Sequence, residues 1–199
     1  MASMRTKPTV PRIAGDETGL SRRDLLLSSA LWMAMAARAR AQAAPEQVEI
    51  DEFSNSGKSL GVKAAPKVVR TEAEWRAKLS PQAFVVTRQA GAERPYTGAY
   101  WSKHDDGLYR CVCCDMALFD ATAKYDSGTG WPSFWSPISK RNIVESEDKS
   151  FGLIRTAVSC RRCDAHLGHV FTDGPKPTGL RYCMNSAALN FFERARGAG

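Results

Sequence analysis

The stretch LIRTAVSCRRCDAHLGHVF, residues 153–171, shows most directly how this chain is built. Two apolar runs within it, residues 153–158 and 167–171, flank Cys160 and Cys163. Each run has the length of a β-strand, and the Cys-x-x-Cys segment between them is polar and short enough to form a tight turn. The stretch therefore predicts two strands that are joined at the cysteines.

Other apolar runs along the chain are equally short. They cover residues 84–87, 108–111, 116–119, 143–147 and 180–184. Turn-rich segments such as DSGTG and DGPKPTG separate them, because glycine, proline and aspartate favour turns. Seven short strands in this arrangement predict a mainly β domain built from antiparallel sheets.

One helix is predicted ahead of these strands. Thr71 and Glu74 have the spacing of a capping box, in which each side chain binds the backbone of the other. Trp75 and Leu79 follow at the spacing of one helical face, and the Ser-Pro pair at residues 80–81 stops the helix. The domain is therefore expected to begin with a short helix that buries Trp75.

The first 43 residues have the order of features found in an export signal. Arg22 and Arg23 precede an uncharged run of 13 residues, 25–37, and Ala-Gln-Ala at 41–43 fits a cleavage site. We expect residues 1–43 to be a twin-arginine-type signal peptide, removed on export to a bacterial periplasm. The apolar run is shorter than the ~20 residues that span a bilayer, so a permanent membrane span is not expected. An amphipathic first helix of the fold is the alternative.

Residues 44–70 are polar without a sustained hydrophobic period, and they predict a linker or arm before a domain over residues 71–195.

The formal net charge of +7 lies mostly at the start of the chain, where residues 1–43 carry a net charge of +4, and the rest of the chain carries +3. The composition is near the average for globular proteins. Because residues 44–199 contain no basic run longer than a pair such as Arg161-Arg162, nucleic acid is not an expected partner.

Six cysteines stand at positions 111, 113, 114, 160, 163 and 183. Four of them form two Cys-x-x-Cys pairs, Cys111 with Cys114 and Cys160 with Cys163. This spacing lets one turn aim two thiolates at a single ion, and four thiolates complete a closed tetrahedral site. The pairs therefore predict one structural Zn²⁺ ion per chain. The alternative is a disulfide framework, which an oxidising compartment permits.

Cys183 has no Cys-x-x-Cys partner. In an extended chain Arg181, Cys183 and Asn185 share one face, where the positive charge of the arginine favours the nucleophilic thiolate. The alternative is that Cys183 is a small buried apolar residue.

The preceding segment HLGHVFTD, residues 166–173, holds two of the three histidines in the chain. Read as a strand, it places His169, Phe171 and Asp173 on one face, so that an acid–base group stands beside a carboxylate and an aromatic ring. The alternative is that these histidines are hydrogen-bonded core groups. Together with Cys183, the segment indicates a candidate catalytic site.

Four segments together resemble one enzyme family. They are WRAKLSPQAFVVTRQAGAERPYTG, YRCVCC, KYDSGTGWPSF and CRRCDAHLGHVFTDGPKPTGLRYCMNSAALNF. From about residue 72 to residue 192 the chain is similar to the B-type peptide-methionine sulfoxide reductases. The resemblance implies a β-tent fold of two antiparallel sheets with short helices and a structural zinc on the two Cys-x-x-Cys pairs. It also implies reduction of the R epimer of methionine sulfoxide, mainly in oxidised proteins or peptides.

The resemblance further implies roles for single residues. Cys183 is the nucleophile and becomes a sulfenic acid, and His169 is the expected proton donor. Trp131 receives the ε-methyl group of the substrate, with Phe134 and Phe171 also on the substrate side. The polar side of the pocket comprises His166, His169, Asp173, Arg181 and Asn185.

One position departs from the family pattern. Thr129 stands where many relatives have a resolving cysteine, so the usual internal disulfide is not expected. A thioredoxin-like or other external thiol then regenerates Cys183, unless the spare Cys113 does so. We expect a monomer. Two other functions remain open from the residues alone: a zinc-knuckle binding module with an inert Cys183, and a thiol–disulfide oxidoreductase that uses one Cys-x-x-Cys pair.

Overall fold

The computed structural model describes residues 45–194, so the signal peptide predicted over residues 1–43 lies outside the described residues. The strands are β1 (Gln47–Phe53), β2 (Ser59–Pro66), β3 (Gly107–Cys111), β4 (Ala117–Asp120), β5 (Lys124–Tyr125), β6 (Ser133–Phe134), β7 (Ile143–Asp148), β8 (Arg155–Cys160), β9 (His166–Phe171), β10 (Arg181–Met184) and β11 (Leu189–Glu193). The helices are α2 (Glu72–Lys78) and α3 (Pro81–Gln89), with short 3₁₀ turns η1 (Ala121–Ala123), η2 (Lys140–Asn142), η3 (Ser150–Gly152) and η4 (Ser186–Ala188). Within residues 45–194, no helix is long and apolar enough to cross a membrane.

The strands form three antiparallel sheets. The largest has six strands in the order β5-β6-β10-β9-β8-β7, the second has three in the order β11-β3-β4, and β1 pairs with β2 in a separate hairpin. Every apolar run that was predicted as a strand from residue 108 onward coincides with one of these strands. The prediction of a mainly β fold with antiparallel sheets and short helices is therefore confirmed.

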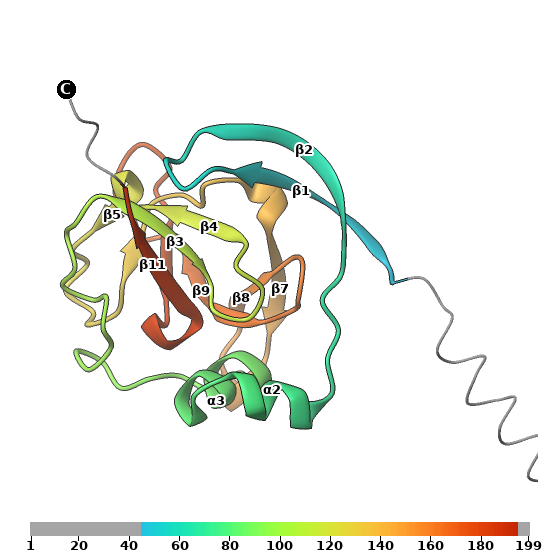
Figure 1. Cartoon of the computed structure of the whole chain (residues 1–199). Coiled ribbons are helices and arrows are strands. Elements are labelled where there is room, and N and C mark those ends of the chain that lie inside the picture. Colours follow the sequence, from blue (N-terminus) through green and yellow to red (C-terminus); the bar gives the residue numbers. More distant parts are fainter. Residues whose placement is uncertain (1–44, 195–199) are drawn as a thin grey trace, which may run out of the picture. The chain divides into compact units, whose positions relative to one another are not determined.

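The two larger sheets pack face to face through aromatic side chains. Tyr109 of β3 and Phe119 of β4 contact Phe134 of β6, with ring centroids 5.0 and 4.4 Å apart. Phe119 also lies 5.9 Å from Tyr182 of β10, and all four rings are fully buried. Figure 1 shows β3, β4 and β11 in front of β8 and β9, with α2 and α3 at the bottom of the domain. The core therefore lies between the sheets.

The alternation of side chains along β10 determines which face carries Cys183. Because Tyr182 points into the core, its neighbours Arg181 and Cys183 point to the opposite, outer face of the six-stranded sheet. The antiparallel register pairs Cys183 with His169 and Arg181 with Phe171. Four of the predicted site residues are thus placed on one surface by strand pairing alone.

Helix α3 replaces a predicted strand. Residues 84–87 were expected to be extended, but they lie in the middle of this helix. The Ser80 hydroxyl caps it by accepting a hydrogen bond from the Ala83 N–H, and Pro81 occupies the first turn, where its missing N–H costs nothing. The Ser-Pro pair therefore ends α2 and also begins a second helix. The prediction was wrong because four apolar residues fit a buried helical turn as well as a short strand.

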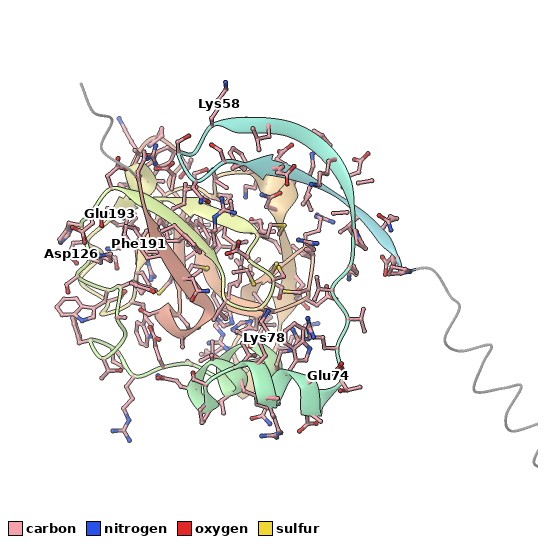
Figure 2. The ribbon with its side chains drawn as sticks, in the orientation of Figure 1. Lys58, Glu74, Lys78, Asp126, Phe191 and Glu193 are labelled. Carbon is pink, nitrogen blue, oxygen red and sulfur yellow. The ribbon has the colours of Figure 1, made fainter. Side chains whose placement is uncertain are left out.

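A β-hairpin occupies most of the segment that was predicted as a linker or arm. Strands β1 and β2 bury Ile50 and Ala65, and the Asn142 side chain accepts from and donates to the β1 backbone at 2.8 Å. Figure 2 shows Lys58 in the turn of this hairpin, pointing away from the domain. The two strands were not predicted because β2 is exposed along most of its length, so its sequence carries no alternating apolar pattern.

Candidate active site

Four cysteine sulfurs lie together at the turns that follow β3 and β8. Cys111 and Cys160 end those strands, and Cys114 and Cys163 lie in the turns. The sulfurs of Cys111 and Cys163 are 3.6 Å apart, and those of Cys114 and Cys160 are 3.5 Å apart. All four lie within 4.8 Å of one another. The structure therefore brings the two Cys-x-x-Cys pairs into one cluster.

The spacing of these sulfurs fits one tetrahedral metal ion. Metal–sulfur bonds of about 2.3 Å place the corners of a tetrahedron about 3.8 Å apart, whereas a disulfide needs about 2.05 Å. The observed distances of 3.5 and 3.6 Å match the tetrahedron and exclude disulfides between those partners. Three of the four cysteines are buried, so the cluster is closed on most sides. The four sulfurs could therefore hold one metal ion, and four thiolates around an ion leave no coordination position for a substrate.

The two cysteine turns have the same backbone geometry. The N–H of Asp115 donates to the Cys111 carbonyl at 2.8 Å, and the N–H of Asp164 donates to the Cys160 carbonyl at 2.9 Å. Both aspartates adopt left-handed conformations, with φ of 63° and 55°. Aspartate tolerates this region better than most residues. Two equivalent turns therefore present their sulfurs to the same point.

Cys113 is separated from solvent although it stands between two cluster residues. Its exposed fraction is 0%, it belongs to the hydrophobic core, and it contacts the hydroxyl of the buried Thr87. Cys183, by contrast, is only partly buried. Cys183 is therefore the cysteine outside the cluster that a substrate can reach.

A cavity of about 350 Å³ opens at Cys183. Six of the predicted site residues line it: Trp131, His166, His169, Phe171, Cys183 and Asn185. Arg155, Gly168 and the loop at residues 90–92 after α3 complete its wall. Aromatic rings and small residues provide much of this wall, and the histidines, the arginine and the asparagine add a few polar groups. That combination is typical of small-molecule sites.

Glycine at position 168 allows β9 to lie close beneath the Cys183 backbone. A side-chain carbon on Gly168 would lie 2.1 Å from the Cys183 carbonyl oxygen and 2.9 Å from the Met184 Cα. No residue with a Cβ fits this space without moving β10. The position of the Cys183 sulfur in the cavity therefore depends on Gly168.

Burial and three polar groups act on the Cys183 thiol in opposite directions. Burial raises its pKa, whereas the Thr129 hydroxyl, the Arg181 guanidinium and the Ser133 hydroxyl each lower it. The Thr129 Oγ1 lies 3.9 Å from the sulfur, and Ser127 links the Thr129 and Ser133 hydroxyls through contacts of 2.8 and 2.7 Å. Because burial has the largest effect, the free thiol has a raised pKa, and the expected Arg181 stabilisation of the thiolate is only partial.

Glu93 is hydrogen-bonded to two residues that line the cavity, Trp131 and Asn185. Its carboxylate accepts hydrogen bonds from the backbone N–H groups of Ser186 and Ala187 at 2.7 and 2.9 Å. Its own N–H donates to Asn185 Oδ1 at 3.0 Å, and its carbonyl accepts from Trp131 Nε1 at 3.2 Å. The residue is 4% exposed, so these bonds are protected from water. Glu93 therefore fixes Trp131 and Asn185 at the same time.

The two histidines have different surroundings. His169 Nε2 lies 2.8 Å from Asp148 Oδ2, so the imidazole of His169 has a carboxylate as its partner. The rings of His166 and His169 are edge to face with centroids 5.2 Å apart. Burial and the nearby His169 lower the pKa of His166 to about 4. At neutral pH His166 is therefore uncharged.

Asp173 and Arg181 form an ion pair outside the cavity lining. The guanidinium donates to both Asp173 oxygens at 2.8 Å and stacks over Phe171 at 4.3 Å. This contact lowers the pKa of Asp173, whose side chain is 62% exposed. Asp173 was expected on the polar side of the pocket, but it does not line the cavity. The carboxylate in contact with His169 is that of Asp148 in β7, and Asp173 is paired with Arg181.

Phe134 also lies elsewhere than predicted. It was expected on the substrate side, but its register places it beside Tyr182 on the buried face of the sheet. Its exposed fraction is 0% and it stacks on Phe119. A contact between Phe134 and a substrate in the cavity is therefore excluded in this conformation, and the neighbouring Ser133 is the residue that pairs with Cys183.

Sequence reasoning missed Glu93, Asp148 and Arg155. Glu93 binds residues 92 to 94 positions away, a separation that no local pattern signals. Asp148 lies one residue beyond the predicted strand 143–147, and its position on the active face follows only from the register of β7 with β8. Extending the predicted strand by one residue would have included Asp148. The contact between Asp148 and His169 depends on tertiary structure, so the sequence could not predict it.

Comparison with known proteins gives consistent matches. The SelR domain matches residues 79–193, which include both the cysteine cluster and the cavity. The peptide methionine sulfoxide reductase MsrB of Herminiimonas arsenicoxydans is 55% identical over 125 residues, 63% of this chain and 91% of the relative. The protein of the same name from Pseudomonas putida W619 is 56% identical over 128 residues, 64% of this chain and 96% of the relative. That from Synechococcus sp. RCC307 is 53% identical over 127 residues, with 64% and 93% covered.

Proposed function

This chain belongs to the SelR-domain family of peptide methionine sulfoxide reductases, and from that premise we propose that it reduces the R epimer of methionine sulfoxide, mainly in oxidised proteins and peptides. One observation carries the proposal for this chain. Cys183 lies outside the four-cysteine cluster, and its sulfur opens into a cavity that Trp131 and His169 share. Attack on a sulfoxide requires an accessible thiol as nucleophile and an acid–base group beside it.

In the proposed reaction the Cys183 thiolate attacks the sulfoxide sulfur. A sulfur–sulfur bond forms while His169 donates a proton to the sulfoxide oxygen, which leaves as water after a second protonation. A water molecule then attacks the Cys183 sulfur, the sulfur–sulfur bond breaks with its electron pair going to methionine, and Cys183 becomes a sulfenic acid as one proton is released. The thiolate sulfur loses the two electrons that the substrate sulfur gains, and methionine leaves. The Thr129 hydroxyl and Arg181 favour the thiolate that burial disfavours.

The cavity has separate places for the methyl group and the oxygen of the substrate. The Trp131 ring is held by its hydrogen bond to the Glu93 carbonyl, so it offers a fixed apolar wall to a methyl group. His169 and Asn185 offer polar groups elsewhere in the lining. A sulfoxide sulfur is chiral, so the other epimer would place its oxygen against the indole. This arrangement supports discrimination between epimers.

We propose Zn²⁺ as the ion of the four-cysteine cluster, because four thiolates at tetrahedral spacing suit zinc. When bound, the ion supplies cross-linking and no chemistry at the substrate. Cys111 and Cys114 hold it from the turn after β3, and Cys160 and Cys163 from the turn after β8. The cluster would therefore join the three-stranded sheet to the six-stranded sheet.

A thioredoxin-like or other external thiol is the proposed reductant of the sulfenic acid, with the chain acting as a monomer. Thr129 has no thiol to offer, and the spare Cys113 is fully buried. The export signal predicted over residues 1–43 would place this repair in the periplasm. The N-terminal sequence of the exported protein tests the last point, because it should begin after residue 43.

The decisive experiment compares turnover of separated R and S sulfoxide epimers of a dabsylated methionine, with dithiothreitol as reductant and zinc measured on the same sample. We expect the wild type to reduce only the R epimer. Cys183→Ser should have no activity and an unchanged zinc content. Cys113→Ser is the matched control, since it also removes one sulfur outside the cluster, and it should retain turnover. Activity in Cys183→Ser, or equal rates on both epimers, would contradict the proposal.

A further inference from the structure

Asp148 reaches the active face from the edge strand of the six-stranded sheet. In β7 it pairs with Arg155 of β8, while His169 of β9 pairs with Ala157, two residues further along β8. Residues two apart on a strand share a face, so Asp148 lies diagonally opposite His169 on the same surface as Cys183. The contact follows from strand register and joins the end of β7 to the cavity.

The Asp148 carboxylate is fixed from three sides. Its Oδ2 lies 2.8 Å from His169 Nε2 and 2.7 Å from an Arg155 nitrogen, and its Oδ1 accepts from the Ser150 N–H at 2.8 Å. Hydrogen bonds from Ser150 and His169 hold the pKa of Asp148 well below its ordinary value. The carboxylate therefore stays ionised at any pH at which the enzyme is expected to work, and it has little freedom to turn away from the ring.

We propose that Asp148 is a positioning residue of sulfoxide reduction, which holds the His169 proton on Nε2 and directs Nδ1 to the substrate oxygen. The inference rests on the proposed function. Asp148 does not line the cavity, whereas the His169 ring does. With Nε2 committed to the carboxylate, Nδ1 is the nitrogen left to face the cavity. A carboxylate behind a histidine fixes both its tautomer and its orientation.

The charged groups around His169 come from four strands. Asp148 of β7 is negative, Arg155 of β8 is positive, His166 of β9 is neutral at pH 7, and the Cys183 thiol of β10 becomes negative when it ionises. The carboxylate favours a positive charge on the ring, whereas Arg155 opposes it. As the Nδ1 proton passes to the substrate oxygen, the ring returns to its neutral form with the proton still on Nε2.

The geometry also separates the roles of the two histidines. A second positive charge on His166, whose ring centroid is 5.2 Å from that of His169, would be repelled once His169 is protonated. The carboxylate contact belongs to His169. Asp148 therefore selects His169 as the proton donor, and His166 remains a neutral wall of the cavity.

The test is Asp148→Asn, measured with Glu147→Gln as its matched control. Glu147 is the preceding residue of β7, so its side chain lies on the face of the sheet opposite to Asp148, and it pairs with Lys149. Glu147→Gln removes one negative charge, as Asp148→Asn does. In Asp148→Asn we expect kcat on the R epimer to fall about tenfold or more, with KM changed little, because general acid catalysis contributes ~10²–10⁴-fold. The alkaline limb of the kcat profile should move to lower pH. Glu147→Gln should behave like the wild type.

Nitrogen NMR of the His169 ring supplies a readout that does not depend on turnover. In the wild type we expect Nε2 to carry the proton across neutral pH, and in Asp148→Asn a mixture of tautomers. Asp148→Glu should restore the Nε2–H signal if the variant with asparagine folds poorly. A wild-type tautomer and an unshifted pH profile in folded Asp148→Asn would overturn the inference. Absence of sulfoxide reduction by the wild type would instead overturn the proposed function, with the NMR result still deciding the contact.

Discussion

The four-cysteine cluster and the Cys183 cavity use the same side chain in opposite surroundings. In the cluster each sulfur has other sulfurs as neighbours, all within 4.8 Å, on turns whose backbones bond back to the strands. Cys183 lies within a strand, and its neighbours are hydroxyls, a guanidinium and a histidine. The difference teaches that the groups around a thiol decide its chemistry: several thiolates together bind a metal, and a solitary thiol in a cavity is available for reaction.

Removing one sulfur from the cluster should have the largest effect. Cys163→Ser leaves three thiolates around the site, and the metal should be lost. In small zinc peptides the ion contributes on the order of 10 kcal/mol to folding, whereas a whole domain is stable by only ~5–15 kcal/mol. We therefore expect Cys163→Ser to be largely unfolded at room temperature, as measured by circular dichroism and metal analysis.

Cys113→Ser is the control for this variant, because Cys113 is equally buried and lies in the same turn as two ligands. It should keep one metal ion per chain and unfold cooperatively. A stable, metal-free Cys163→Ser protein with full activity would show that the cluster does not support the fold.

The strands could be predicted from sequence better than the contacts between them. Runs such as residues 108–111 and 180–184 coincide with β3 and β10, so they were predicted correctly. Strands β5 and β6 have two residues each, too few for any period, and β11 follows a 3₁₀ turn without a clear boundary. Residues 84–87 were misassigned because a buried helical turn shows the same short apolar run.

The part of the site that could be predicted is the part that follows from alternation along one strand, which places every second side chain on the same face of the sheet. The shared face of Arg181 and Cys183 follows from residue spacing, and the pairing of β10 with β9 adds His169. The choice between Asp148 and Asp173 as the carboxylate of His169 was not predictable. It depends on the register of β7, β8 and β9 and on a competing arginine, which only the assembled sheet reveals.

A second prediction changes the neighbours of Cys183 and leaves the cluster untouched. Thr129→Cys places a thiol where a hydroxyl now lies 3.9 Å from the Cys183 sulfur, in a turn flanked by Gly128 and Gly130 with φ of 70° and 84°. A shift of about 2 Å brings the sulfurs to disulfide distance, which the glycines permit. We expect one turnover without reductant to leave a disulfide between the introduced thiol and Cys183, detected as a loss of two hydrogens by mass spectrometry.

In the wild type and in the control Thr129→Ser, the same experiment should leave a Cys183 sulfenic acid that dimedone traps. Thioredoxin should support faster turnover of Thr129→Cys than of Thr129→Ser, since it reduces disulfides directly. Trapping of equal amounts of sulfenic acid in both variants would mean that the turn holds residue 129 away from Cys183.

The smallest expected effect concerns the ionisation of Cys183. Burial raises the pKa of this thiol and Arg181 lowers it, so the thiolate fraction should grow as pH rises, with a midpoint above the ~8.5 of a free cysteine. Iodoacetamide reacts with the thiolate, and its rate at Cys183, followed by peptide mass spectrometry, reports that fraction.

Arg181→Met removes the positive charge that favours the thiolate, so the midpoint of the Cys183 titration should move to still higher pH. Alkylation at pH 7.5 should then slow several-fold, and by about tenfold if the pKa of Cys183 rises by one. Lys63→Met, which removes a positive charge from the exposed Lys63–Glu52 pair of the hairpin, should leave the rate unchanged. A midpoint at or below that of free cysteine would show that the polar neighbours outweigh burial and that the cavity holds a thiolate before any substrate binds.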